Sequence, residues 1–241
     1  MKENIEQLNG IWRIIPSMVL TEVIAQSCFD FQIFDCEHGP YDFQTLEEDI
    51  RICKYQKSLA YVRVSGLNKV EIQRCLDLGA DGIVFPQLSK YEDFKLATEL
   101  VQYPPKGLRG FNPFVPAGEY GYRSIHDNRI ECIVIIETVQ ALEILDEILE
   151  LPDLDVIYIG VYDLSAQLNV IGEVDSPILI SAINEIIEKC NKASKKICFM
   201  VKNDDEYHRY KDKGVRYFVH IVDSYQLKTA FVNILKNLTT Q

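Results

Sequence analysis

The 241-residue sequence is poor in positive charge, with 25 Lys and Arg residues against 36 Asp and Glu residues and a formal net charge of −11. A chain with this excess of negative charge gains no electrostatic attraction to a polyphosphate backbone, which argues against nucleic-acid binding. It also lacks any apolar stretch of the roughly 20 residues that a membrane-spanning helix needs. The N-terminal segment "MKENIEQLNG" has no apolar core of the kind found in signal peptides. We therefore expect a cytoplasmic protein that binds neither nucleic acid nor a membrane.

Two further patterns are missing. The seven cysteines are odd in number and none of them form a C-x-x-C pair, so neither a disulfide framework nor a thiolate zinc site is indicated. No G-x-G-x-x-G motif opens a helix, which disfavours an open sheet that binds a dinucleotide. What the sequence does contain is 47% hydrophobic and 10% aromatic residues, enough for a sizeable core.

Short apolar runs alternate with amphipathic segments along the whole chain. The runs are rich in Val and Ile, as in strands that are buried on both faces. They span residues 12–16, 31–35, 60–64, 82–86, 132–137, 156–160, 197–201 and 217–222. Eight strands that alternate with helices predict an α/β fold, a single (β/α)8 TIM barrel over residues 1–241, with an open doubly wound sheet as the alternative.

Ionisable residues gather where these strands end, which is the catalytic rim of such a barrel. They are Asp35, Glu37 and His38 after the second strand, Arg63 at the end of the third, Glu137 at the end of the fifth, Asp163 past the sixth and Asp223 after the eighth. Two carboxylates from neighbouring strands can hold a hard divalent cation, since Mg²⁺ is often bound by one or two carboxylates. A helix N-cap for Asp163 and an internal salt bridge for Glu137 are the alternatives.

Six motifs occur in a specific order: "FDCEHGP", "VRV", "CLDLGADGIVFPQ", "YPPKGLRG", "IIETVQALEILDEIL" and "IYIGVYDLS". With these motifs the chain resembles the HpcH/HpaI aldolase family of metal-dependent pyruvate aldolases, from about Trp12 to Asp223. The fold of that family is a (β/α)8 barrel, in agreement with the periodicity of the apolar runs. The resemblance implies a homo-oligomer that packs through its C-terminal helices, and here the last predicted helix, near Leu227 to Leu238, carries an apolar stripe.

The resemblance also implies a role for each residue of the site. The metal ligands would be Glu137 and Asp163, holding Mg²⁺, Mn²⁺ or Co²⁺. The catalytic residues would be His38 as acid and base, Asp77 as the carboxylate that orients it, and Arg63 at the keto oxygen of pyruvate. The substrate-binding residues would be Asp35, which supports the pocket, and Gly160, Val161 and Tyr162, whose backbone amides meet the pyruvate carboxylate.

These residues fit a carbon–carbon lyase that cleaves or forms a 4-hydroxy-2-oxo acid, giving pyruvate and an aldehyde. A decarboxylase of a 2-oxo diacid such as oxaloacetate, acting at the same site, is one alternative. A non-catalytic barrel that binds a metabolite is another, because Ile135 and Val161 depart from the family pattern. Ile135 replaces a usual Gln, Val161 a usual Pro, and Pro116 a frequent Arg.

The remaining candidate residues give weaker indications of a functional role. Arg109 could bind an anionic substrate tail or brace its own loop. His126, His208 and His220 have no partner at metal-binding spacing and are expected to be solvent-exposed or to pack.

Overall fold

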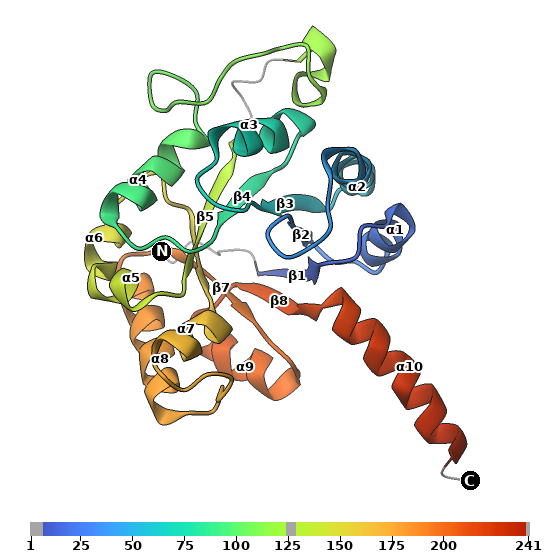
Figure 1. The fold of residues 1–241 in the computed structure, drawn as a ribbon, viewed down its shortest axis with the longest axis vertical. Helices are drawn as coiled ribbons and strands as arrows, with labels where there is room; N and C mark the ends of the chain where they lie inside the picture. Colours follow the sequence, from blue (N-terminus) through green and yellow to red (C-terminus); the bar gives the residue numbers. More distant parts are fainter. Residues whose placement is uncertain (1–6, 124–128, 240–241) are drawn as a thin grey trace.

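Eight parallel strands close into a barrel in the order in which they occur along the chain (Figure 1). The structure is a computed structural model and describes residues 7–123 and 129–239. The strands are β1 (Leu8–Arg13), β2 (Phe31–Asp35), β3 (Leu59–Arg63), β4 (Gly82–Phe85), β5 (Glu131–Ile136), β6 (Val156–Ile159), β7 (Lys196–Met200) and β8 (Tyr217–Val222). Because β8 pairs with β1, no strand is left at an open edge. The predicted (β/α)8 fold is confirmed.

Helices connect the strands and surround the barrel (Figure 1). They are α1 (Met18–Gln26), α2 (Phe43–Gln56), α3 (Lys69–Leu78), α4 (Tyr91–Leu100), η1 (Pro116–Gly121), α5 (Val139–Glu143), α6 (Leu145–Leu149), α7 (Val161–Gln167), α8 (Pro177–Lys192), α9 (Asp204–Asp212) and α10 (Asp223–Thr239). No helix in the described ranges is long and apolar enough to cross a membrane.

Helix α2 illustrates how the sequence specifies these elements. The side chain of Asp42 accepts a hydrogen bond from the N–H of Thr45 at 2.8 Å, and the Thr45 hydroxyl accepts one from the N–H of Asp42 at 3.3 Å. This capping box fixes the start of the helix. Leu46, Ile50 and Cys53 follow at helical spacing and are completely buried. The spacing therefore turns one face of the helix onto the outside of the barrel.

The first strand lies earlier in the chain than its apolar run predicts, at residues 8–13 instead of 12–16. The backbone N–H groups of Ile14 and Ile15 donate to the two carboxylate oxygens of Asp223, each at 3.1 Å. A side chain from the start of α10 thus replaces the strand neighbour at these residues. Because this partner lies about two hundred residues away in sequence, the local pattern does not reveal where the strand ends.

A polar cluster fills the end of the barrel where the strands begin. Glu131 accepts hydrogen bonds from the hydroxyl of Tyr61 at 2.5 Å, the Nζ of Lys196 at 2.5 Å and the hydroxyl of Tyr217 at 3.0 Å. The ring of Phe31 packs against both tyrosines. Above this cluster the barrel interior is apolar as far as the opposite end, where the strands finish.

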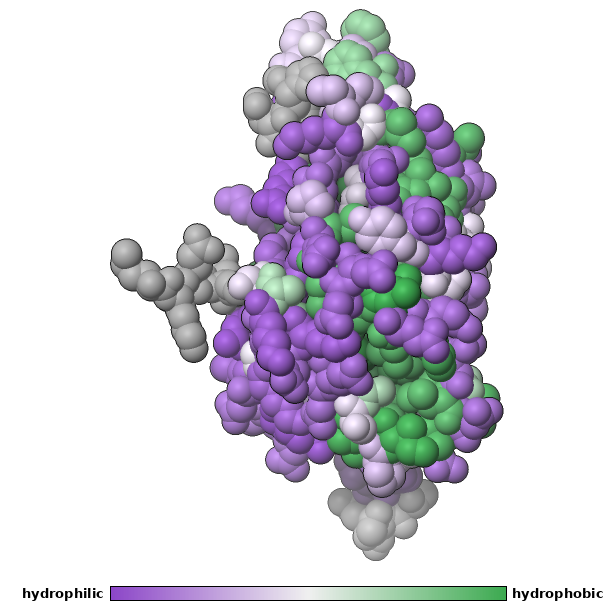
Figure 2. Space-filling view, turned by 90° about the vertical axis from the view of Figure 1, so that its left-hand side faces the viewer, coloured by the Kyte–Doolittle hydropathy of each residue, from purple (hydrophilic) through white to green (hydrophobic). Residues whose placement is uncertain are grey.

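Helix α10 extends away from the barrel toward the C-terminus (Figure 1). Its apolar stripe is exposed, with 62% of Phe231, 57% of Ile234 and 69% of Leu238 accessible to solvent. The stripe therefore does not cover the chain's own barrel. The face of the molecule in Figure 2 is largely hydrophilic, with a hydrophobic band along its right-hand side. The homo-oligomer stays a prediction, which the exposed stripe supports.

Candidate active site at the mouth of the barrel

A cavity of about 320 Å³ lies where the strands end, and most of the predicted site residues line it. These are Asp35, His38, Arg63, Glu137, Gly160, Val161, Tyr162 and Asp163; the rest of the wall is formed by Trp12, Ile14, Ile135, Tyr158, Ile159, Met200 and Val222. The volume falls within the range of small-molecule sites. Of the predicted site residues, only Asp77 does not line this cavity.

Asp35 and Arg63 form the rigid part of the site. Arg63 donates from Nε and from a terminal nitrogen to the two oxygens of Asp35, at 2.9 and 2.5 Å. Asp35 also accepts from Nε1 of Trp12 and from the backbone N–H groups of Glu37 and His38, each at 3.0 Å. Burial by itself would raise the pKa of Asp35, but these hydrogen bonds and the charge of Arg63 lower it below its ordinary value. The carboxylate therefore stays ionised and anchors the turn that carries His38.

The guanidinium of Arg63 is held from three sides. Besides Asp35, it pairs with Glu37 at 3.0 Å, and it lies over the Trp12 ring at 4.7 Å from the ring centroid. Burial would lower the pKa of Arg63, but the contacts with Asp35 and Glu37 raise it. The side chain is thus a fixed cation at the edge of the cavity.

Glu137 and Asp163 bring two further carboxylates to the same cavity. One oxygen of Glu137 accepts the backbone N–H of Gln87 at 2.5 Å. Burial raises the pKa of Glu137 to about 7, and the charges of Asp163 and Glu37 act in the same direction. Glu137 makes no ion pair within the described chain, and the N-cap of α7 is Gly160, not Asp163. Neither of the two alternative roles considered for these carboxylates is therefore observed.

Gly160 allows this close packing. A Cβ atom at Gly160 would lie 2.6 Å from the Cβ of Glu137, 2.7 Å from Cγ2 of Ile135 and 2.9 Å from Oε2 of Glu137. Any side chain would therefore displace the carboxylate. The next residues, Val161 and Tyr162, begin α7, where backbone N–H groups have no acceptor within the helix.

Asp77 lies elsewhere. Both of its carboxylate oxygens accept from Nε2 of Gln73, at 3.0 and 2.9 Å, and one lies 3.6 Å from a terminal nitrogen of Arg109. Asp77 belongs to the last turn of α3, which returns the chain to the end of the barrel where the strands begin. The expected contact between Asp77 and His38 is therefore not made within one chain, because the two residues sit at opposite ends of the barrel.

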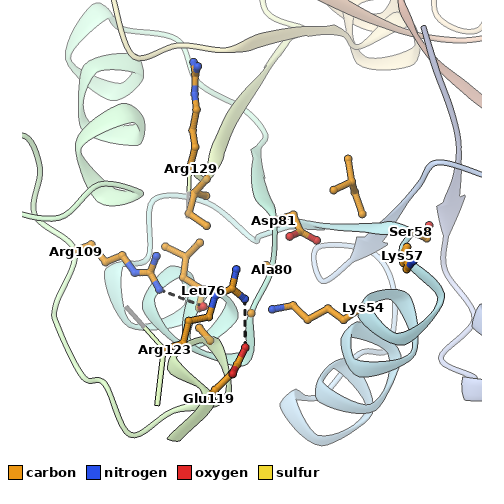
Figure 3. A pocket seen from close by; sticks show the side chains of 14 residues that line it. Lys54, Lys57, Ser58, Leu76, Ala80, Asp81, Arg109, Glu119, Arg123 and Arg129 are labelled. Atoms are coloured by element: carbon orange, nitrogen blue, oxygen red, sulfur yellow. Dashed lines mark hydrogen bonds and ion pairs between the residues drawn. The ribbon is translucent and has the colours of Figure 1, made fainter. Parts of the chain in front are cut away.

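A second cavity of about 500 Å³ lies beside these residues, at the start of β3 to β5 (Figure 3). Its lining includes the cations Lys54, Lys57, Arg109, Arg123 and Arg129 and the carboxylates Asp81 and Glu119. Arg109 is 3% exposed, donates to the carbonyl of Leu76 at 3.2 Å and covers the Tyr103 ring. It therefore braces its own loop, one of the two roles expected for it. Pro116 begins η1 and does not line the mouth cavity.

Other histidines take no part in the site. The ring of His220 contacts Asn9 at 3.0 Å and packs against Phe29 and Tyr207. Burial lowers the pKa of His220. His208 packs edge-on to Tyr207, and His126 lies outside the described residues. His220 is therefore a packing histidine and His208 is exposed to solvent, the two roles expected for these residues.

Comparison with known proteins decides the family. Residues 10–223 match the family described as HpcH/HpaI aldolase/citrate lyase. The chain belongs to this family. A 2-dehydro-3,6-dideoxy-6-sulfogluconate aldolase from Pseudomonas putida is 31% identical over 185 residues, covering 75% of this chain and 72% of the relative. A 4-hydroxy-2-oxo-heptane-1,7-dioate aldolase from Klebsiella pneumoniae is 30% identical over 220 residues, which cover 89% of this chain and 83% of the relative.

A solved structure with the same fold is that of the citrate synthase SbnG. It is 28% identical, with a TM-score of 0.89, and the match covers 98% of this chain and 94% of that one. Together with the named aldolases, membership of the HpcH/HpaI family makes this chain an enzyme of the lyase and aldolase class.

Three residues that bring polar groups to the site were not predicted from the sequence: Trp12 and Tyr158, which line the cavity, and Gln87, which contacts Glu37 and Glu137. Trp12 holds Asp35 and Arg63 as described above. Gln87 has a left-handed backbone (φ 57°) directly after β4 and donates from its side chain to Glu37 at 2.6 Å, so it links Glu37 to Glu137. Its position at the end of "GIVFPQ" could have predicted a place at the site, because residues that follow the ends of the strands lie at the mouth of a barrel. Tyr158 is inside an apolar run and gave no such signal.

Proposed function

We propose that this chain is a metal-dependent pyruvate aldolase, which cleaves or forms a 4-hydroxy-2-oxo acid to give pyruvate and an aldehyde. The observation that carries the proposal is one cavity that holds three carboxylates, a fixed guanidinium and an imidazole. Its named relatives act as aldolases. A small 2-oxo acid also suits a cavity of about 320 Å³.

Glu137 and Asp163 are the residues that would hold the divalent cation, Mg²⁺, Mn²⁺ or Co²⁺. Their oxygens are hard donors, and two carboxylates are enough for a cation that keeps water or substrate in its other positions. Burial and, to a smaller extent, the charge of Asp163 raise the pKa of Glu137, and a cation between the two carboxylates would offset both effects. When bound, the cation supplies positive charge at the keto oxygen of the substrate.

The chain's own residues would position the 2-oxo acid. The free N–H groups at Val161 and Tyr162 are suited to its carboxylate, and Gly160 keeps the approach open. Arg63 would lie at the keto oxygen, where negative charge grows as the carbon–carbon bond breaks. Since Asp35, Glu37 and Trp12 already fix the guanidinium, it needs little reorganisation during the reaction.

His38 would transfer the proton. In the cleavage direction it takes the proton of the C4 hydroxyl, the C3–C4 bond breaks, and its electrons remain on the pyruvate enolate. An imidazole is the side chain that most often takes this role in enzymes. Asp77 can orient His38 only if a second copy of the chain supplies it, so the orienting role requires the proposed homo-oligomer.

The decarboxylase alternative uses the same groups, and the departures at Ile135 and Val161 motivate a non-catalytic barrel. One experiment separates them: metal-loaded protein is incubated in D₂O with pyruvate alone, with pyruvate plus short aldehydes, and with oxaloacetate. An aldolase exchanges the methyl protons of pyruvate, seen by NMR, and forms new 4-hydroxy-2-oxo acids. A decarboxylase consumes only oxaloacetate. Absence of exchange, addition and decarboxylation would refute the enzymatic proposal.

A further inference from the structure

The floor of the mouth cavity contains a phenol that none of these roles uses. Tyr158 lies on β6, in register with Ile135 on β5 and with Cys198 on β7. Its side chain points into the barrel interior, where it packs edge-on to the Trp12 ring at 5.3 Å between centroids. Tyr158 is 5% exposed and lines the same cavity as Arg63 and Glu137.

The hydroxyl of Tyr158 has no hydrogen-bond partner within the described chain. The other inward-facing tyrosines differ, since Tyr61 and Tyr217 both donate to Glu131. The Tyr158 oxygen is also not among the buried polar atoms of the described residues that are sealed from solvent without a partner. The hydroxyl therefore opens onto the cavity, where only water or a ligand can satisfy it.

The neighbouring position explains why a donor is needed there. Ile135 occupies the place where the family usually carries a Gln amide, and it is 2% exposed at the same cavity. Its side chain, Gly160 and Glu137 pack directly against one another. An isoleucine cannot donate a hydrogen bond, so β5 leaves this part of the floor apolar. Tyr158 brings a hydroxyl to the same level of the barrel from the adjacent strand.

We propose that Tyr158 binds the 2-oxo acid directly, donating a hydrogen bond to a substrate oxygen and replacing the amide that is absent at position 135. Burial raises the pKa of the Tyr158 hydroxyl well above its ordinary value, so the phenol stays protonated at neutral pH. Its O–H can then donate to a negatively charged substrate oxygen, which makes a stronger hydrogen bond than a neutral acceptor. This inference rests on the proposed function, because it assumes that the cavity holds a 2-oxo acid and its enolate. It makes Tyr158 a catalytic residue of this chain.

The test compares Tyr158→Phe with a matched control, Tyr217→Phe. Both changes remove one inward-facing hydroxyl and keep the ring, but Tyr217 lies in the cluster at the other end of the barrel. Two quantities are measured: the rate of pyruvate methyl-proton exchange, and the affinity for oxalate, a planar dianion shaped like the enolate, by calorimetry with Mn²⁺. We expect Tyr158→Phe to lower the exchange rate on the order of 10²-fold and oxalate affinity about tenfold. Tyr217→Phe should change neither, and Mn²⁺ affinity should stay the same in both variants.

A rescue variant distinguishes substrate binding from a packing effect. Ile135→Gln introduced into Tyr158→Phe should recover at least part of both losses, whereas Ile135→Gln alone should bring no gain. If Tyr158→Phe keeps exchange and oxalate affinity within twofold of the parent chain, the inference is wrong although the aldolase proposal stands. If the parent chain shows no exchange but binds oxalate, the affinities alone decide the role of Tyr158. If it neither exchanges nor binds oxalate, both proposals fail.

Discussion

Mixing two inactive variants should restore activity, because the structure separates His38 from Asp77 within one chain. His38→Ala should slow turnover on the order of 10² to 10⁴-fold, the usual contribution of general acid–base catalysis. Asp77→Ala should be impaired as well if Asp77 orients the imidazole. When both are co-expressed in equal amounts, a site assembled from two copies keeps His38 from one and Asp77 from the other in about one quarter of cases. We therefore expect roughly 25% of the parent activity per site.

The control is a mixture of His38→Ala with Glu137→Gln. Both of these residues line the same cavity of one chain, so every site in the mixture lacks one of them and no activity should return. The one-quarter expectation applies to the unselected mixture; purification through two different tags, one on each variant, removes unmixed assemblies and should raise the activity per site above it. The reasoning is refuted if Asp77→Ala alone is fully active, or if the His38→Ala and Asp77→Ala mixture is no better than its components.

Four further changes test other parts of the molecule. Glu137→Gln should weaken Mn²⁺ binding at least tenfold by calorimetry, since it removes a charged ligand, and unchanged affinity would contradict the metal assignment. Arg63→Lys should reduce turnover on the order of 10²-fold, because a lysine cannot hold the fork to Asp35; steady-state rates check this. Phe231→Asp, on the exposed stripe of α10, should shift the mass in light scattering toward a monomer, and a parent chain that is already monomeric would exclude the oligomer. Glu131→Gln should lower the unfolding free energy by about 2 kcal/mol in urea titrations while leaving Mn²⁺ affinity unchanged, because its partners lie at the other end of the barrel.

The apolar runs predicted the fold because each strand is buried on both faces, which gives a local signal that needs no knowledge of its neighbours. Runs at 31–35 and 217–222 coincide with β2 and β8. The gathering of charged groups at one rim was predictable for the same reason: parallel strands all finish at one end. Asp35, Arg63, Glu137 and Asp163 therefore meet in one cavity, as expected from their places at strand ends.

Contacts between distant parts of the chain were decided by the tertiary structure alone. The carboxylate of Asp223 ends β1, and the direction of α3 carries Asp77 away from His38. Tyr158 belongs to an apolar run in the sequence, yet its inward position beside Ile135 leaves its hydroxyl open to the cavity. Local sequence reports which faces are apolar, but the closure of the barrel determines which side chains from different strands reach the same point, and therefore which polar atoms are left without a partner.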